Sequence, residues 1–128
     1  MADPVVRVQS ADGRGPYRPG FSWRWSDPQG PLVMPWWEEI GLSMREAHSQ
    51  LTPEYHWGCG FRTMDQLHSW FTSRELSKLS RLGFAMVRII PAVVVAETPT
   101  QVVFGTVEPL SEARPRIRLA SDLVRTAA

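Results

Sequence analysis

Hydrophobic and polar positions follow their most regular pattern in the second half of the chain. Thr63 is followed three residues later by Gln66, and Thr72 is followed by Glu75. Each pair matches the capping box, in which a hydroxyl group and a Glu or Gln side chain satisfy free amide groups at a helix start. Apolar residues recur at helical spacing after both pairs: Met64, Leu67, Trp70 and Phe71, then Leu76, Leu79 and Leu82. The pattern predicts two short helices, and Gly83 is suited to end the second.

Strands are predicted where β-branched and aromatic residues are concentrated. Residues 84–90, 92–96 and 101–107 are three such runs, and Pro91 separates the first two. Residues 5–8 form a shorter apolar run, and residues 21–25 alternate apolar and polar positions with a period of two. We therefore predict strands in the first four segments, and a short strand or an extended arm over residues 21–25.

Turn signals interrupt the chain between these runs. Residues 13–20 contain three glycines and two prolines and predict a structured loop. Apolar spacing after Pro35 predicts a helix over 36–50, although Gly41 weakens it by about 1 kcal/mol relative to alanine. Residues 54–62 include Gly58 and Gly60 and are interpreted as a tight strand or loop.

These elements predict an α+β fold, with a small mixed or antiparallel sheet and two to three short helices on one side. The chain has 128 residues, which predicts a single domain over 1–110. Residues 111–128 form a basic tail with little apolar periodicity, for which we expect partial disorder or late docking.

Composition indicates the surroundings in which the chain is expected to work, but it says less about the function. Fourteen basic and 13 acidic side chains give a net charge of +1, which argues against a nucleic acid as the direct ligand. Cys59 is the single cysteine, so no internal disulfide can form and the bacterial cytoplasm is the expected location. The first residues lack the pattern of a signal peptide, and no apolar run is long enough to cross a membrane, so no membrane association is expected.

Cys59 is also a candidate nucleophile, or a zinc ligand together with His56 and His68. No orienting carboxylate and no second pair of ligands accompanies it in the sequence, so a structural role is favoured and no metal is expected. In the loop over 13–20, Arg14, Tyr17 and Arg18 could face an anionic ligand such as pyrophosphate. Loops rich in glycine and proline are mostly connectors, so packing is the favoured interpretation there.

Tryptophan and arginine suggest a surface that binds a partner protein, because these residue types dominate protein interfaces. The residues of this candidate surface are Trp23, Arg24, Trp25, Trp36 and Trp37. A short chain also needs large side chains in its core. The sequence leaves both interpretations of these tryptophans open.

Several segments resemble a group of uncharacterised small phage and prophage proteins. The resemblance is carried by residues 13–22, with the motif GRGPYRPGFS, and by residues 60–71, 82–84 and 101–104. It implies a phage or prophage gene. Small accessory genes of this kind often encode proteins that bind host machinery, including anti-CRISPR and other anti-defence inhibitors.

The order of elements more remotely resembles compact ADP-ribosyltransferase-like folds. The resemblance implies that Arg7 or Arg18, with Tyr17 nearby, would hold the phosphates of NAD. Thr63 would lie near the nicotinamide ribose, and Gln101 would stand where the family has its catalytic glutamate. An amide cannot stabilise an oxocarbenium-like centre as a carboxylate does, so Glu97 is considered as a substitute.

Two functions from different classes follow from these resemblances. The first is a non-catalytic phage protein that binds a host or phage protein and inhibits or modulates it, without a cofactor. The alternative is an NAD-dependent enzyme that ADP-ribosylates a host protein. A virion or assembly component is a further alternative.

Overall fold

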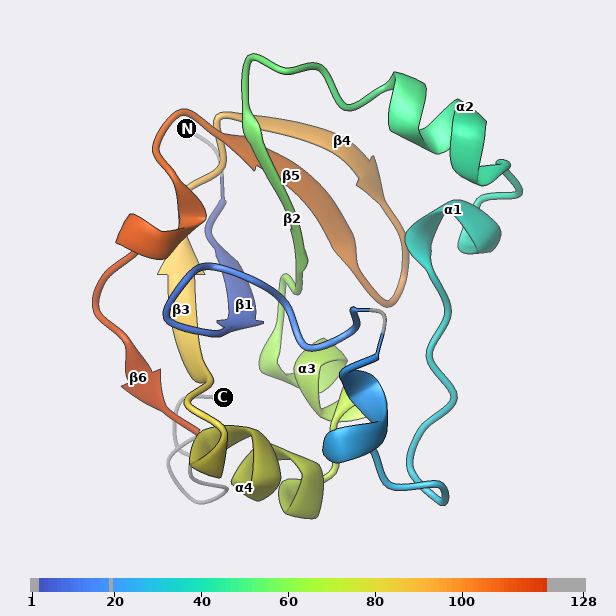
Figure 1. The fold of residues 1–128 in the computed structure, drawn as a ribbon. Helices are drawn as coiled ribbons and strands as arrows, with labels where there is room; N and C mark the ends of the chain where they lie inside the picture. The colour runs from blue at the N-terminus through green and yellow to red at the C-terminus, as the bar shows by residue number, and fades with distance from the viewer. Residues whose placement is uncertain (1–2, 19, 120–128) are drawn as a thin grey trace.

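The computed structural model describes residues 3–18 and 20–119 and contains two small antiparallel sheets, each with helices packed against it (Figure 1). The strands are β1 (Val5–Gln9), β2 (His56–Gly60), β3 (Ala85–Ile89), β4 (Val93–Glu97), β5 (Val102–Thr106) and β6 (Ile117–Arg118). The α-helices are α1 (Trp36–Glu39), α2 (Met44–Ser49), α3 (Met64–Trp70) and α4 (Ser73–Arg81). Two 3₁₀ helices are η1 (Ser22–Arg24) and η2 (Leu110–Glu112). The predicted α+β class is confirmed.

The strands are divided between the two sheets in the orders β1-β3-β6 and β2-β5-β4. One bridge joins them, because the amides and carbonyls of Val6 and Phe61 exchange two hydrogen bonds of 2.8 and 2.7 Å. Close approach at this junction requires Gly60, since a Cβ atom there would lie 2.6 Å from the carbonyl oxygen of Val6. The sheets therefore meet where β1 passes the end of β2.

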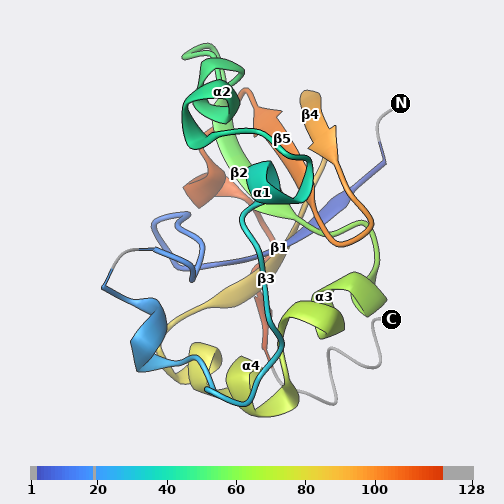
Figure 2. The same cartoon turned by 90° about the vertical axis from the view of Figure 1, so that its right-hand side faces the viewer.

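Three apolar clusters fill the spaces around the sheets. The first packs β1 and β3 against α3, α4 and η1; Trp25, Leu67, Leu76 and Leu79 are fully buried in it. The second contains Val5, Val87 and Phe104 and lies between the two sheets. The third packs Trp36 and Ala47, from α1 and α2, against Val103 of β5. Seen from the side in Figure 2, α1 and α2 lie at one end of the molecule and α3 and α4 at the other.

The helix starts agree with the capping signals. Thr72 and Glu75 form a complete capping box at α4, and Gly83 adopts a φ of +89° just after this helix. Thr63 accepts a hydrogen bond from the Gln66 amide at the start of α3. The Gln66 side chain does not complete the box, because it contacts the main chain of Arg62 and Pro99.

Two predicted elements are wrong. Residues 21–25 form a 3₁₀ turn rather than a strand, because Phe21 and Trp25 both turn into the core while Trp23 is 76% exposed. The helix predicted over 36–50 is two helices, because Gly41 has a φ of +76° and Ser43 starts α2 with a capping box of its own.

The described part of the predicted tail belongs to the fold. Strand β6 pairs with β3, Leu119 is buried, and the Arg116 guanidinium donates to the carbonyls of Ser10 and Gly83. Residues 120–128 lie outside the described residues. No helix in the described part of the chain is long and apolar enough to span a membrane.

Candidate functional site

A cleft of about 640 Å³ opens beside β1 and offers a space that could hold a ligand. Its walls come from the 13–18 loop, from β1 and β2, from residues 33–37 and from the end of α3. Three arginines (Arg7, Arg14 and Arg18) line it, and no described Asp or Glu does so. The cleft is therefore more basic than the nearly neutral chain as a whole.

Arg7 lines this cleft and is 7% exposed. Its guanidinium donates to the carbonyl oxygens of Cys59 (2.7 Å) and Gly13 (3.0 Å) and to the side-chain oxygen of Gln9 (2.9 Å). Burial lowers the pKa of Arg7, and the nearby Cys59 opposes this effect. Among residues 3–18 and 20–119, no carboxylate forms a salt bridge with it. Because arginine stays protonated in proteins, this buried charge has no anionic partner within the described protein.

Two glycines give the guanidinium its space. A Cβ atom on Gly58 would lie 3.0 Å from Nη1 of Arg7, closer than ordinary contact, whereas one on Gly15 would lie 3.6 Å from Nη2. Gly15 belongs to the loop and Gly58 to β2, so the side chain is enclosed between these two segments. Glycine is needed at position 58 because the backbone of β2 approaches the planar group too closely for a Cβ atom, whereas the loop at Gly15 leaves room for one.

Aromatic rings form much of the remaining wall. Those that line the cleft are Tyr17, Trp36, Trp37, Trp57, Phe61, Trp70 and Phe71. Tyr17 contacts Trp70 edge to face, with ring centroids 5.5 Å apart, and stacks on Phe71 at 6.0 Å. Burial, and then the charge of Glu75, raise the pKa of the Tyr17 phenol. Flat apolar walls with a buried cation are suited to a ligand that combines rings with negative charge.

Gln101 enters the cleft from the residue before β5 and is 3% exposed. Its Nε2 donates to the Glu39 carboxylate and to the carbonyl of Met34 (3.0 Å). Sequence reasoning missed Glu39, because its partners come from a segment about 60 residues away and no local pattern links them.

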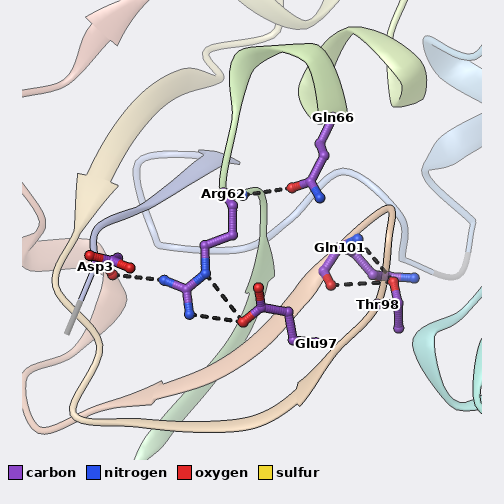
Figure 3. Close-up of polar contacts among 6 residues, drawn as sticks. All are labelled: Asp3, Arg62, Gln66, Glu97, Thr98 and Gln101. Carbon is purple, nitrogen blue, oxygen red and sulfur yellow. Dashed lines mark hydrogen bonds and ion pairs between the residues drawn. The ribbon is translucent and has the colours of Figure 1, made fainter.

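Glu97 and Thr63 lie outside the lining of the cleft. Glu97 forms an ion pair with Arg62 (3.0 Å), and the same guanidinium donates to the Asp3 carbonyl (Figure 3). Thr63 uses its hydroxyl to cap α3. Of the three residues considered for catalysis, the structure brings only Gln101 into the same cleft as Arg7.

The two other predicted ligand-binding residues lie nearer the mouth. Arg18 lines the cleft and its guanidinium lies 4.4 Å from the Phe21 ring centroid. Tyr17 is 41% exposed. Arg7, Tyr17 and Arg18 therefore line one cleft.

Cys59 also lines the cleft, but its environment does not activate it. Burial raises the pKa of the thiol, and Arg7 only partly opposes this effect. Histidine donates no hydrogen bond to it among the described residues, and no group of three metal-ligating side chains occurs in that part of the chain. A nucleophilic thiolate needs a lowered pKa, so the structural interpretation of Cys59 is favoured.

The five residues of the predicted partner surface are separated by the fold. Trp25 is fully buried and Trp36 is 4% exposed, so neither is available on the surface. Trp25 instead donates from its indole to the Pro16 carbonyl (3.2 Å) and supports the loop of the cleft. Trp36 and Trp37 line the cleft, and Trp23 and Arg24 are exposed. The prediction of one joint surface is corrected accordingly.

Comparison with known proteins adds the family. No curated protein and no solved structure matches the chain significantly. The model of the family described as Bacteriophage T4 Y00F protein matches residues 1–113, a segment that contains every residue lining the cleft. The chain therefore belongs to the Bacteriophage T4 Y00F protein family, which confirms the predicted relationship to phage proteins.

Proposed function

We propose that this phage accessory protein binds an NAD-type dinucleotide in the cleft. The observation that carries the proposal is the buried Arg7 guanidinium, which has no carboxylate partner among the described residues and lines a basic, aromatic-lined cleft. A buried charge is strongly unfavourable unless it is paired, and a pyrophosphate would supply the missing negative charge.

The chemistry of the lining fits the two halves of such a ligand. Each terminal nitrogen of Arg7 carries one N–H beyond the one that it donates to Cys59 or Gly13, and these two donors would serve phosphate oxygens, with Arg18 lining the same cleft. Tyr17, Trp37 and Trp57 offer ring faces and edges against which an adenine or nicotinamide ring would stack, an interaction worth about 1–3 kcal/mol per base.

The binding would serve an ADP-ribosyltransferase-like protein directed at a host protein. Such transfer breaks the bond between nicotinamide and ribose C1 and joins C1 to a nucleophile of the acceptor, and a carboxylate normally stabilises the positive charge that develops. No described residue lining the cleft is a carboxylate, and Gln101 is neutral. Binding is therefore the function that the geometry supports best, and any transfer should be slow.

Tryptophan fluorescence tests the binding, because four of the six tryptophans line the cleft. We expect NAD to quench the fluorescence at micromolar concentration, Arg18→Ala to weaken this binding, and Arg88→Ala to leave it unchanged. Arg88 is the matched control because it is an exposed arginine on β3 that does not line this cleft. Equal quenching in all three proteins, or none at millimolar NAD, would refute the proposal.

A second candidate function is binding of a host or phage protein. It is favoured by the concentration of exposed apolar side chains in one segment: Tyr17, Trp23, Leu32, Met34, Ile40 and Met44. Leu32 is 103% exposed and Trp23 is 76% exposed. Large apolar groups of this kind are typical of protein interfaces. If this candidate is right, the double variant Trp23→Ser with Leu32→Ser should abolish the effect of the protein on phage growth in cells and should still bind NAD. An unaltered effect on phage growth would refute this candidate.

A further inference from the structure

Glu39 and Gln101 form a polar pair behind the wall of the cleft. The Glu39 carboxylate accepts hydrogen bonds from the hydroxyls of Thr98 (3.2 Å) and Thr100 (2.6 Å) as well as from Nε2 of Gln101. The carboxylate is thus held by three donors from the turn that precedes β5. It belongs to α1, so it also ties the 33–39 segment to the sheet.

The pair determines which way the Gln101 amide faces. Both neighbours of Nε2, the Glu39 carboxylate and the Met34 carbonyl, are acceptors. An amide oxygen in that position would face two oxygens without a donor, so the nitrogen must lie there. The opposite atom, Oε1, consequently points away from this pair.

Oε1 has no donor in the described protein and keeps some exposed surface. No described residue donates a hydrogen bond to it, and the only fully buried side-chain polar atom without a partner in the described part of the chain is Nε2 of His68. Since Gln101 lines the cleft, Oε1 is an accessible acceptor with a fixed direction. A polar group of fixed orientation in an otherwise apolar wall is the usual source of ligand specificity.

We propose that Gln101 is a specificity-determining residue whose Oε1 accepts a hydrogen bond from a neutral donor group of the ligand, and that Glu39 is the positioning residue that orients it. This inference rests on the proposed dinucleotide function. The donor would be the carboxamide of the nicotinamide ring or a ribose hydroxyl, which share this chemistry. A ligand carboxylate at the same place would face Oε1 without a donor and would bind more weakly.

The test compares three probes, NAD, nicotinic acid adenine dinucleotide and ADP-ribose, by calorimetric titration. The proteins are the wild type, Gln101→Met, Glu39→Gln and Glu38→Gln. Glu38 is the matched control, because it is an exposed carboxylate on the same helix for which no hydrogen bond to Gln101 occurs. Partial unfolding lowers the stoichiometry of binding rather than the Kd, so the Kd remains informative for destabilised variants.

We expect Gln101→Met to weaken NAD binding about tenfold, which corresponds to the loss of one ligand hydrogen bond. Glu39→Gln should weaken it several-fold, and Glu38→Gln should leave it unchanged. If the donor is the carboxamide, the wild type binds NAD more tightly than nicotinic acid adenine dinucleotide, and Gln101→Met and Glu39→Gln lose that preference. If the donor is a ribose hydroxyl, these variants weaken all three probes equally.

Unchanged Kd values for all three probes in Gln101→Met would overturn the role of Gln101. Equal effects of Glu38→Gln and Glu39→Gln would overturn the positioning role, because they would indicate a general effect of charge. Absence of NAD binding by the wild type would instead remove the proposed function itself, and this inference with it.

Discussion

The sharpest structural consequence of the Arg7 site concerns the glycine beside it. In Gly58→Ala, the new Cβ would lie 3.0 Å from Nη1 of Arg7, 3.1 Å from its Cζ and 3.0 Å from Cδ1 of Leu110. Each separation is several tenths of an ångström short of ordinary contact. The guanidinium must therefore move away from the Cys59 carbonyl, to which it now donates at 2.7 Å.

The expected cost follows from three contributions. Overpacking costs about 1–3 kcal/mol. Weakening a hydrogen bond from a charged donor adds about 1.5 kcal/mol. Reduced freedom of the unfolded chain returns about 0.4–1 kcal/mol. We predict a net loss of about 3 kcal/mol in the free energy of unfolding, which corresponds to a decrease in Tm of about 11 °C for a chain of this length.

Gly15→Ala is the matched control, since its Cβ would lie 3.6 Å from the same guanidinium and its φ is not positive. We expect it to change stability by less than about 1 kcal/mol, in the stabilising direction. Urea unfolding followed by fluorescence measures both variants. A loss below about 0.5 kcal/mol in Gly58→Ala, or equal losses in the two variants, would refute the account of how Arg7 is enclosed.

Three further predictions concern single side chains. Trp25→Ala should destabilise the protein by about 3–5 kcal/mol because the indole is fully buried, whereas Trp23→Ala should cost less than about 1 kcal/mol; similar losses in urea unfolding would contradict the packing described for η1. The raised pKa of Tyr17 favours the neutral phenol in the folded state, so its contribution to stability is complete below the ordinary pKa of about 10 and is lost as the pH rises through the folded value. The difference between the ultraviolet titration curves of the wild type and Tyr17→Phe should show the Tyr17 phenol ionising above the ordinary pH range. Ionisation near pH 10 would contradict this. Cys59 should react with a disulfide reagent at pH 7 at least about tenfold more slowly in the folded protein than in urea, because burial raises the pKa of its thiol, and equal rates would argue against the burial.

Local patterns predicted the second half of the chain well because its signals act within a few residues. Thr72 with Glu75 starts α4, and valine-rich runs became β4 and β5. The alternation in 21–25 predicted a strand wrongly, because its aromatic residues fit a helical spacing of four as well as a strand period of two. Over 36–50, the apolar spacing continues across the break between α1 and α2, so periodicity alone indicates one helix. The capping box of Ser43 is the local signal that marks the start of the second helix.

The candidate site was only partly predictable. Arg7, Tyr17 and Arg18 were expected near an anionic ligand, and they line one cleft. Gly58 is important because β2 contacts the side chain of Arg7, which belongs to β1. Glu39 is important because its carboxylate accepts hydrogen bonds from the turn before β5. Contacts between segments 50 or more residues apart arise from the fold, so no local pattern in the sequence indicates them.

On the proposed function, the phosphates of a dinucleotide supply the negative charge that the buried Arg7 lacks. Calorimetric titration of NAD into the wild type and into Arg7→Met tests it most directly, with Arg88→Met as the matched control and thermal unfolding as the check on folding. The account predicts a Kd on the order of micromolar for the wild type and the control, and a loss of at least about 100-fold in Arg7→Met, in line with removal of a buried charge-assisted contact. Binding of NAD by folded Arg7→Met with the wild-type Kd, or no binding by the wild type at millimolar NAD, would contradict it.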